Sequence, residues 1–175
     1  MRVCLSLLSL CLLAVTATIS AEDWNQFRGA AGNGKTLAEL PLEFSESDGV
    51  AWKVPLPGKA WSSPVIWKKQ IWVTNALPDG HKLWALCFDL ETGKKTHDIL
   101  VFDVAEPQFC IAKNSYASPT PVIEEGRIFV SFGAHGNACI DTATGKTIWE
   151  RRDLQCNHHR APASSPIPYG DLYIL

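Results

Sequence analysis

The chain has 175 residues, of which 46% are hydrophobic and 19% are charged, and its formal net charge is −2. This composition is that of a folded globular protein and excludes an intrinsically disordered chain. The slight acidic excess gives no support to nucleic-acid binding.

The first 21 residues are typical of a secretory signal peptide. Arg2 precedes an apolar run that ends at Val15, and small residues follow before the first acids, Glu22 and Asp23. The run is shorter than the roughly 20 apolar residues of a transmembrane helix, so we expect no transmembrane segment. A lipoprotein alternative would use Cys11, but a leucine stands where a small residue normally precedes that cysteine. We therefore expect a secreted, periplasmic or cell-envelope protein.

Residues 22–49 form an N-terminal lead-in, and residues 50–175 repeat themselves. A short segment with a proline before a β-branched residue, followed by an alternating apolar run, occurs three times, at Pro64, Pro121 and Pro166. These prolines are 57 and 45 residues apart. Periods near these values are typical of units of four short strands.

A second signature, Asp-x-x-Thr-Gly, follows the first two copies, with its aspartates 52 residues apart. The carboxylate can accept backbone N–H groups of the turn, and the glycine supplies a positive φ. Four residues after the second glycine comes Trp149, which we expect to wedge between neighbouring units, whereas the first unit has His97 there. The expected structural docking residues are Asp89, Gly93, Asp141, Gly145 and Trp149.

In the second unit, turn chemistry predicts strands at 119–124, 127–132, 137–141 and 146–153, with turns at 125–126 and 142–145. Four such strands make one blade of a β-propeller. The fold class predicted is therefore all-β, with blades near 58–103, 115–153 and 163–175.

The segment from Asp141 to Trp149, with Ser-Pro opening the next unit, resembles the tryptophan-docking repeat of the pyrroloquinoline-quinone (PQQ) type β-propellers. That superfamily includes the quinoprotein alcohol dehydrogenases and a non-enzymatic lipoprotein of outer-membrane assembly. The leader from Asp23 to Gly29 and the segment from Val50 to Gly58 are similar to the opening of secreted bacterial PQQ-like repeat proteins. The resemblance covers the chain from about residue 23 to its end and implies a PQQ-like β-propeller.

Propellers close into a ring of roughly four to eight blades, but the repeats here amount to only about two and a half. Such an incomplete ring would leave long exposed edges. We therefore expect the sequence to be a fragment, with the missing blades supplied by a longer chain.

The connections that lead into the inner strands open onto one face of a propeller. They bring cationic, amide and aromatic side chains together in a net acidic protein, which favours a small anionic or planar ligand. The alternative is that these are solvated loop residues, with the aromatic rings filling the channel mouth. The candidate ligand-binding residues are Lys59, Trp61, Lys113, Asn114, Tyr116, His158, His159 and Arg160.

Four cysteines follow the leader. Cys87 and Cys139 hold the same place in neighbouring units, where a disulfide would not span the distance, so we expect buried free thiols. Cys110 and Cys156 lie in longer connections, and their pairing stays open. Cys156 with its two neighbouring histidines lacks the usual zinc spacing, so no metal site is expected.

These observations favour a binding or scaffolding module that interacts with an unknown protein or a small anionic ligand. No catalytic residue and no cofactor is evident in this stretch. The alternative is a fragment of a PQQ-dependent quinoprotein dehydrogenase, an oxidoreductase whose catalytic residues, PQQ and calcium would be held beyond residue 175. Under that alternative the enzyme would oxidise an alcohol or a sugar.

Overall fold

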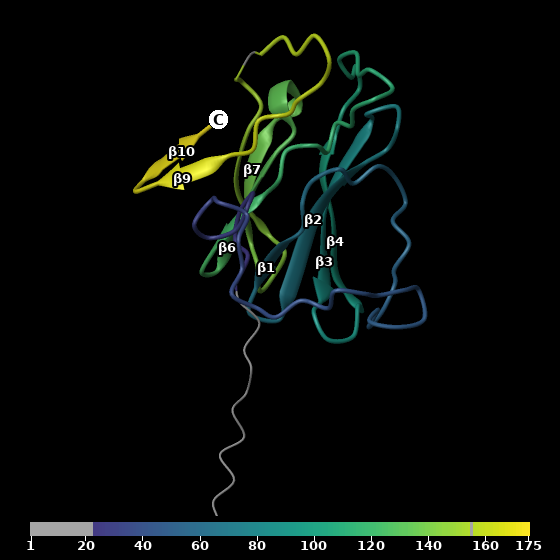
Figure 1. Cartoon of the computed structure of the whole chain (residues 1–175). Helices are drawn as coiled ribbons and strands as arrows, with labels where there is room; N and C mark the ends of the chain where they lie inside the picture. Colours follow the sequence, from purple (N-terminus) through teal and green to yellow (C-terminus); the bar gives the residue numbers. More distant parts are fainter. Residues whose placement is uncertain (1–22, 155) are drawn as a thin grey trace, which may run out of the picture.

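The computed structural model describes residues 23–154 and 156–175. The signal peptide expected at residues 1–21 lies outside them. The described residues form two four-stranded antiparallel sheets and one hairpin, which stand side by side (Figure 1). The all-β fold class predicted from the sequence is confirmed.

The first sheet is a meander in which each strand pairs with the next along the chain. Trp72, Leu83 and Leu86 are fully or almost fully buried in it, because the two central strands carry apolar side chains on both faces. Its strands are β1 (Val65–Trp67), β2 (Gln70–Ala76), β3 (Lys82–Asp89) and β4 (Lys95–Asp103).

The second sheet repeats this order with β5 (Val122–Glu124), β6 (Arg127–Ser131), β7 (Asn137–Asp141) and β8 (Thr147–Arg151). All four strands lie where the sequence predicts them: β7 has the predicted bounds, and the other three are shorter than predicted. The first strand starts at Val122 rather than at residue 119, because Pro119 and Pro121 have no N–H to give to a ladder. The second strand ends at Ser131, one residue before its predicted end, and a 3-10 turn, η1 (Gly133–His135), follows it.

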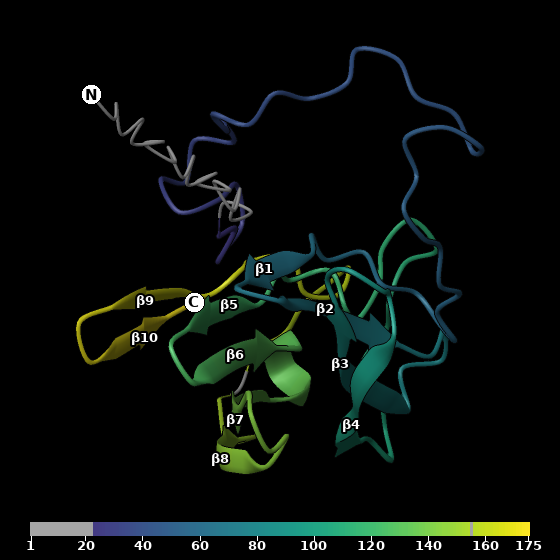
Figure 2. The same cartoon turned by 90° about the horizontal axis from the view of Figure 1, so that it is seen from below.

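The third copy of the repeat forms a hairpin of β9 (Ile167–Tyr169) and β10 (Leu172–Ile174). It lies beside the second sheet in both views (Figures 1 and 2). Tyr173 joins the two, since its ring lies 5.8 Å from that of Phe129 and 5.7 Å from that of Trp149.

One continuous hydrophobic core runs between the two sheets. It contains Val65 and Trp72 from the first sheet and Ile123, Ile128 and Ile140 from the second. Burial of this shared core is the main force that holds the sheets together. The N-terminal segment also links the two sheets through backbone hydrogen bonds. Trp24 and Ile66 of β1 exchange bonds of 2.9 and 2.8 Å, and the N–H of Ile123 in β5 donates to Asn25 O.

The two Asp-x-x-Thr-Gly turns have the geometry that the sequence predicts. Asp141 Oδ1 accepts hydrogen bonds from the N–H and the hydroxyl of Thr144, both at 2.7 Å. Asp89 Oδ1 accepts the same pair from Thr92. These bonds hold the pKa of both carboxyls below the ordinary value, and both turn glycines have a positive φ.

The residues that follow these turns occupy equivalent places. Cys139 is opposite Trp149 in the second sheet, and Cys87 is opposite His97 in the first. Trp149 is half-buried against Phe129 and Tyr173, so it reaches the next unit as predicted.

The turn glycines take part in the contacts between neighbouring segments. A Cβ on Gly145 would lie 3.0 Å from Nδ1 of His97 on the first sheet. A Cβ on Gly93 would lie 2.5 Å from the indole of Trp52. The indole N–H of Trp52 also donates to Leu90 O at 3.0 Å. Trp52 therefore docks on the first sheet as His97 docks on the second.

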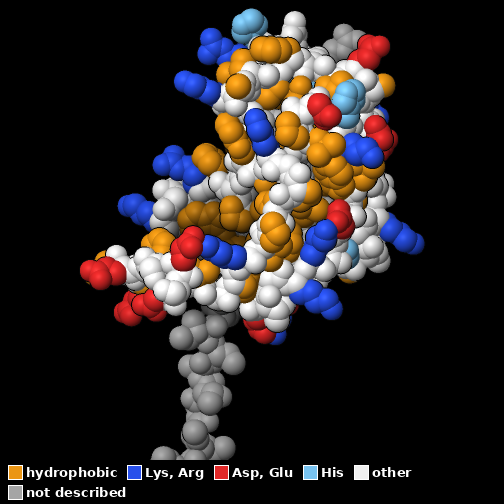
Figure 3. Space-filling model, turned by 90° about the vertical axis from the view of Figure 1, so that its right-hand side faces the viewer, with side chains coloured by type: hydrophobic (Ala, Val, Ile, Leu, Met, Phe, Trp, Pro, Cys, Tyr) orange, Lys and Arg blue, Asp and Glu red, His pale blue; other side chains and the backbone are white. Residues whose placement is uncertain are grey.

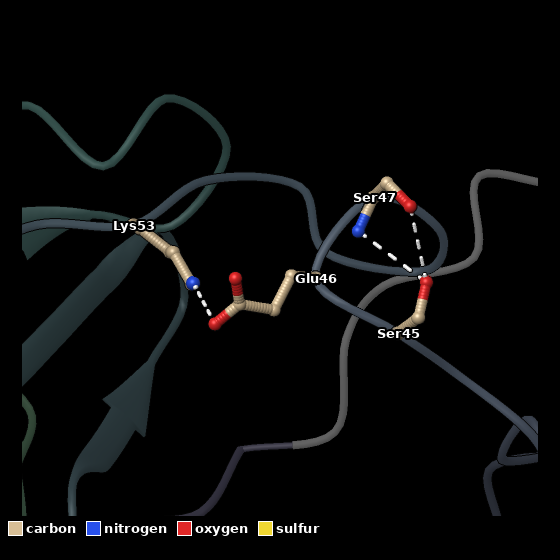
Figure 4. A network of polar contacts seen from close by, with 4 residues as sticks. All are labelled: Ser45, Glu46, Ser47 and Lys53. Atoms are coloured by element: carbon tan, nitrogen blue, oxygen red, sulfur yellow. Dashed lines mark hydrogen bonds and ion pairs between the residues drawn. The ribbon is translucent and has the colours of Figure 1, made fainter.

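The lead-in arches away from the sheets before it returns to them at Trp52 (Figure 2). Ser45 and Asp48 close a small turn with reciprocal backbone hydrogen bonds. In the same turn the hydroxyls of Ser45 and Ser47 contact each other, and Lys53 Nζ pairs with Glu46 at 2.7 Å (Figure 4). Hydrophobic side chains gather on one face of the molecule (Figure 3). The large hydrophobic side chains with the highest exposure are on the lead-in, on the hairpin and, for Phe109, on the loop after β4; they are Leu37, Leu40, Leu42, Phe44, Phe109, Tyr169 and Leu172.

The two sheets and the hairpin do not close into a ring within residues 23–154 and 156–175. The observed architecture is thus a row of antiparallel units with a repeated contact between neighbours.

Candidate ligand-binding site

Hydrogen bonds bring together the three connections that the sequence selects as candidate loops. The hydroxyl of Ser115 donates to Lys59 O at 2.9 Å. The amide of Asn114 donates to Arg160 O at 2.9 Å and accepts from the Ser118 hydroxyl at 2.6 Å. The Asn114 side chain therefore links two loops, and both its amide nitrogen and its amide oxygen form hydrogen bonds within the protein.

The other candidate side chains separate into two groups. Lys59 and Trp61 lie together, with Lys59 Nζ 5.9 Å from the centre of the indole ring, and half of Trp61 is exposed. Lys113, His159 and Arg160 are exposed, and His158 is half-buried. Trp61 does not line the same hollow as the histidines. The structure thus divides the predicted cluster instead of joining all of it.

Tyr116 is part of the core rather than of an open surface. Only 6% of it is exposed, and its hydroxyl donates to Gln108 O at 2.6 Å. Its ring meets that of His135 edge to face at 5.3 Å. Burial raises the pKa of the phenol, so the hydroxyl stays a donor. The ring and the hydroxyl of Tyr116 are therefore committed to internal contacts.

His158 and His159 line an open hollow of about 610 Å³, which we call the histidine hollow. Its floor and walls come from the loop after β4, from η1 and from the connection that leads to β9. The remaining residues that line it are Gln108, Phe109, Ala134, Arg152, Leu154, Cys156 and Asn157.

Gln108 fixes the two loops of the histidine hollow relative to each other. Its side-chain amide donates to Cys156 O at 3.3 Å, and its Oε1 accepts the N–H of His158 at 3.4 Å. Its own N–H donates to Nε2 of His135 at 3.0 Å. Burial lowers the pKa of His135, which keeps the ring neutral and leaves Nε2 free to accept that bond.

The electrostatic character of the histidine hollow is cationic. Arg152 lies over the Phe102 ring at 5.1 Å and donates to Asp103 O at 3.4 Å, so its guanidinium is oriented by two contacts. Among the described residues that line the hollow, none is an aspartate or a glutamate. An arginine and two imidazoles without an opposing acid can attract and hydrogen-bond an anion.

Arg152, Gln108 and Phe109 are site residues that the sequence analysis missed. Arg152 follows β8 in a run of charged residues and looks like a solvated strand end. Gln108 and Phe109 belong to the longer first repeat, whose period of 57 residues exceeds the second by 12. That excess length is the one signal in the sequence that this loop could contribute residues to a site.

The four described cysteines are all free, so Cys110 and Cys156 are not paired. Cys87 and Cys139 are buried, as predicted, and burial raises the pKa of each thiol to about 11. Cys156 is exposed, with its Sγ 3.8 Å from Nδ1 of His158. Within the described residues, no three His, Cys, Asp or Glu side chains gather as a metal site.

No protein-family model and no curated protein sequence matches this chain. In the part of the chain that the structure describes, no helix has the length and apolar character needed to cross a bilayer.

Proposed function

We propose that this chain is part of a secreted or periplasmic β-propeller of the PQQ-like type, which serves as a binding module for a small anionic ligand. The sheets provide the scaffold, and the histidine hollow provides the contacts. Because a fold does not fix a function, the ligand has to be argued from the hollow itself.

The propeller arrangement is supported by contacts that recur from one unit to the next. The N–H of Ser63 donates to Oγ1 of Thr120 at 3.0 Å, and the N–H of Thr120 donates to Oγ of Ser165 at 3.0 Å. These three residues each precede the proline of their own repeat. Equal contacts between equivalent positions give a regular rotation from blade to blade, which is how a propeller is built. Further blades would complete the ring.

The observation that carries the ligand proposal is the charge of the histidine hollow. The whole chain has more acids than bases, 18 against 16, yet Arg152, His158 and His159 face this hollow without an acidic neighbour in its lining. A locally cationic recess on a net acidic protein favours an anion over a neutral ligand.

The rigidity of the hollow supports binding as well. Gln108 and Asn114 both lie on the connection between β4 and β5, and their side chains hydrogen-bond to backbone atoms of the connection that leads to β9. Loops that are already fixed lose less conformational entropy when a ligand binds, so a given contact yields more affinity. The exposed ring of Phe109, 69% accessible, offers a face on which a planar anion can stack.

The test uses inorganic phosphate and citrate as probes and follows the thermal midpoint at constant ionic strength. We expect both anions to raise the midpoint of the wild-type chain, and the rise to be lost in the double variant Arg152→Gln, His159→Gln. Lys146→Gln is the matched control, since it removes one positive charge from an exposed turn outside the hollow. The control should keep the full rise.

An equal rise in the double variant would refute the histidine hollow as the site, and no rise in any form would refute anion binding. Adding PQQ and Ca²⁺ with an electron-accepting dye and an alcohol or sugar tests the enzymatic alternative. Turnover of the alcohol or sugar would show that the protein is an oxidoreductase and would refute the proposal of a binding module.

A further inference from the structure

A second hollow lies where the connections to β1, β5 and β9 meet the N-terminal segment. It has a volume of about 410 Å³ and is separate from the histidine hollow, with which it shares no lining residue. Its wall carries hydroxyl groups from three successive repeats and two aromatic rings. We call it the hydroxyl hollow; the residues that matter for its chemistry are Phe27, Trp61, Ser63, Thr120 and Ser165.

The hydroxyls of this hollow are oriented by the contacts between units. Oγ1 of Thr120 accepts the N–H of Ser63, and Oγ of Ser165 accepts the N–H of Thr120, each at 3.0 Å. A hydroxyl has one donor and two acceptor positions. Since the backbone uses only an acceptor position, these contacts leave the hydrogen of each hydroxyl uncommitted. Thr120 is buried, with 2% exposed, whereas Ser63 and Ser165 are half-buried and present their hydroxyls to the hollow. The hollow therefore offers fixed, uncharged hydrogen-bond donors.

The aromatic rings of the hydroxyl hollow are unusually open. Trp61 is 50% exposed and Phe27 is 53% exposed, although large aromatic side chains are normally well buried. Both come from segments that are tied to neighbouring strands. Trp61 is followed by Ser62, whose N–H donates to Ala117 O, and Phe27 follows the Trp24 bridge to Ile66. The rings are thus presented on anchored backbone and not on free ends.

Charge separates this hollow from the first one. None of the described residues that line it is Asp, Glu, Lys, Arg or His. The lining itself offers a charged ligand no counter-charge, and Lys59 Nζ, 5.9 Å from the centre of the Trp61 ring, is engaged by that ring. A purely apolar ligand would leave the hydroxyls without partners, which is costly. The ligand that fits has apolar faces for the rings and several hydroxyl groups for the serines.

We propose that the hydroxyl hollow is a carbohydrate-binding site, which takes a neutral pyranose with one face of the sugar against Trp61. The C–H groups on one side of a pyranose form an apolar face, and its hydroxyls lie around the edge. Ser63 and Ser165 then donate to the sugar oxygens, and Phe27 covers part of the remaining C–H surface of the ring. This site is independent of the anion site, because the two hollows share no lining residue.

The experiment titrates the chain with neutral probes, methyl α-glucopyranoside, methyl β-galactopyranoside, cellobiose and maltotriose. Binding is measured by calorimetry and by saturation-transfer NMR. We expect at least one probe to bind, with saturation transfer to its ring C–H protons. Trp61→Ala should weaken binding by about tenfold, since it removes the aromatic contact, and Trp61→Phe should retain part of the affinity.

Tyr169→Ala is the matched control, because it removes an aromatic side chain that is 74% exposed and lies outside the hollow. It should bind the probes as the wild type does. Ser165→Ala should also weaken binding, because it removes a hydroxyl that donates to the sugar. The proposal is overturned if no probe binds at millimolar concentrations, or if Trp61→Ala, confirmed as folded by circular dichroism, binds with wild-type affinity. Competition by phosphate would also contradict it, because it would place the sugar in the histidine hollow.

Discussion

His97 stacks on Trp72 with ring centres 5.3 Å apart and planes 12° from parallel. The equivalent pair in the second sheet is Trp149 on Phe129, at 6.1 Å. Trp72 and Phe129 hold the same register, opposite Val65 and Val122. Each sheet therefore has a pair of rings at the same position. In the first sheet the larger ring, Trp72, is on the second strand and the smaller, His97, on the fourth; in the second sheet the smaller ring, Phe129, is on the second strand and the larger, Trp149, on the fourth.

The first prediction concerns this exchange of ring sizes. His97→Trp should destabilise the chain by about 1 to 3 kcal/mol, because two indoles overfill the space above Gly145. The double variant Trp72→Phe, His97→Trp recreates the pair of the second sheet and should recover most of that loss. Urea unfolding of the wild type, both single variants and the double variant measures the coupling. Additive losses would show that the two rings do not share the space.

The second prediction concerns the turn glycine under Trp52. Gly93→Ala places a methyl group against the indole and also forces an alanine into a positive φ. Gly126→Ala is the control, since Gly126 has a similar φ of 79° but no atom near the new Cβ. The control should cost about 1 to 2 kcal/mol from backbone strain alone.

Gly93→Ala should lower the free energy of unfolding, measured with urea, by more than Gly126→Ala does. The difference between the two losses measures the contact of Gly93 with Trp52. In the background Trp52→Ala the methyl group meets no ring, so the two glycine variants should become equal. A difference that persists without Trp52 would assign the cost to something else.

The third prediction is a loss of stability at alkaline pH. Burial raises the pKa of Cys87 and of Cys139 from the ordinary 9.0 to about 11. Above about pH 9 the unfolded chain releases these protons while the folded chain keeps them. Stability is therefore full below pH 9 and falls as the pH rises towards 11. The midpoint of urea unfolding from about pH 8 to about pH 11 measures this fall.

The variant Cys87→Ala, Cys139→Ala should show a flatter alkaline profile, from a lower starting stability. Thiol labelling gives a second readout at pH 8. Cys156 is exposed and should react in the folded chain, whereas Cys87 and Cys139 should react only after unfolding. Rapid labelling of either buried thiol in the folded state would contradict the burial on which the prediction rests.

Local chemistry decided the features that the sequence predicts well. The Asp141 turn, the strands on either side of it and the equivalence of His97 with Trp149 follow from short-range hydrogen bonding, the φ of glycine and the alternation of apolar residues. All of these act within about ten residues, so a single chain segment contains the information. The same holds for the buried thiols, because Cys87 and Cys139 lie on the central strand of each sheet.

The two hollows depend on contacts that no local pattern specifies. Tyr116 and Trp61 look alike in sequence, each shortly after a lysine in a connection that leads into an inner strand, yet Tyr116 is 6% and Trp61 50% exposed. The difference arises because the loop that carries Gln108 covers Tyr116 and leaves Trp61 open. By itself the sequence determined the repeated antiparallel units and their turns. Only the tertiary structure decided which loop side chains share a hollow, because that depends on how loops from different units cover one another.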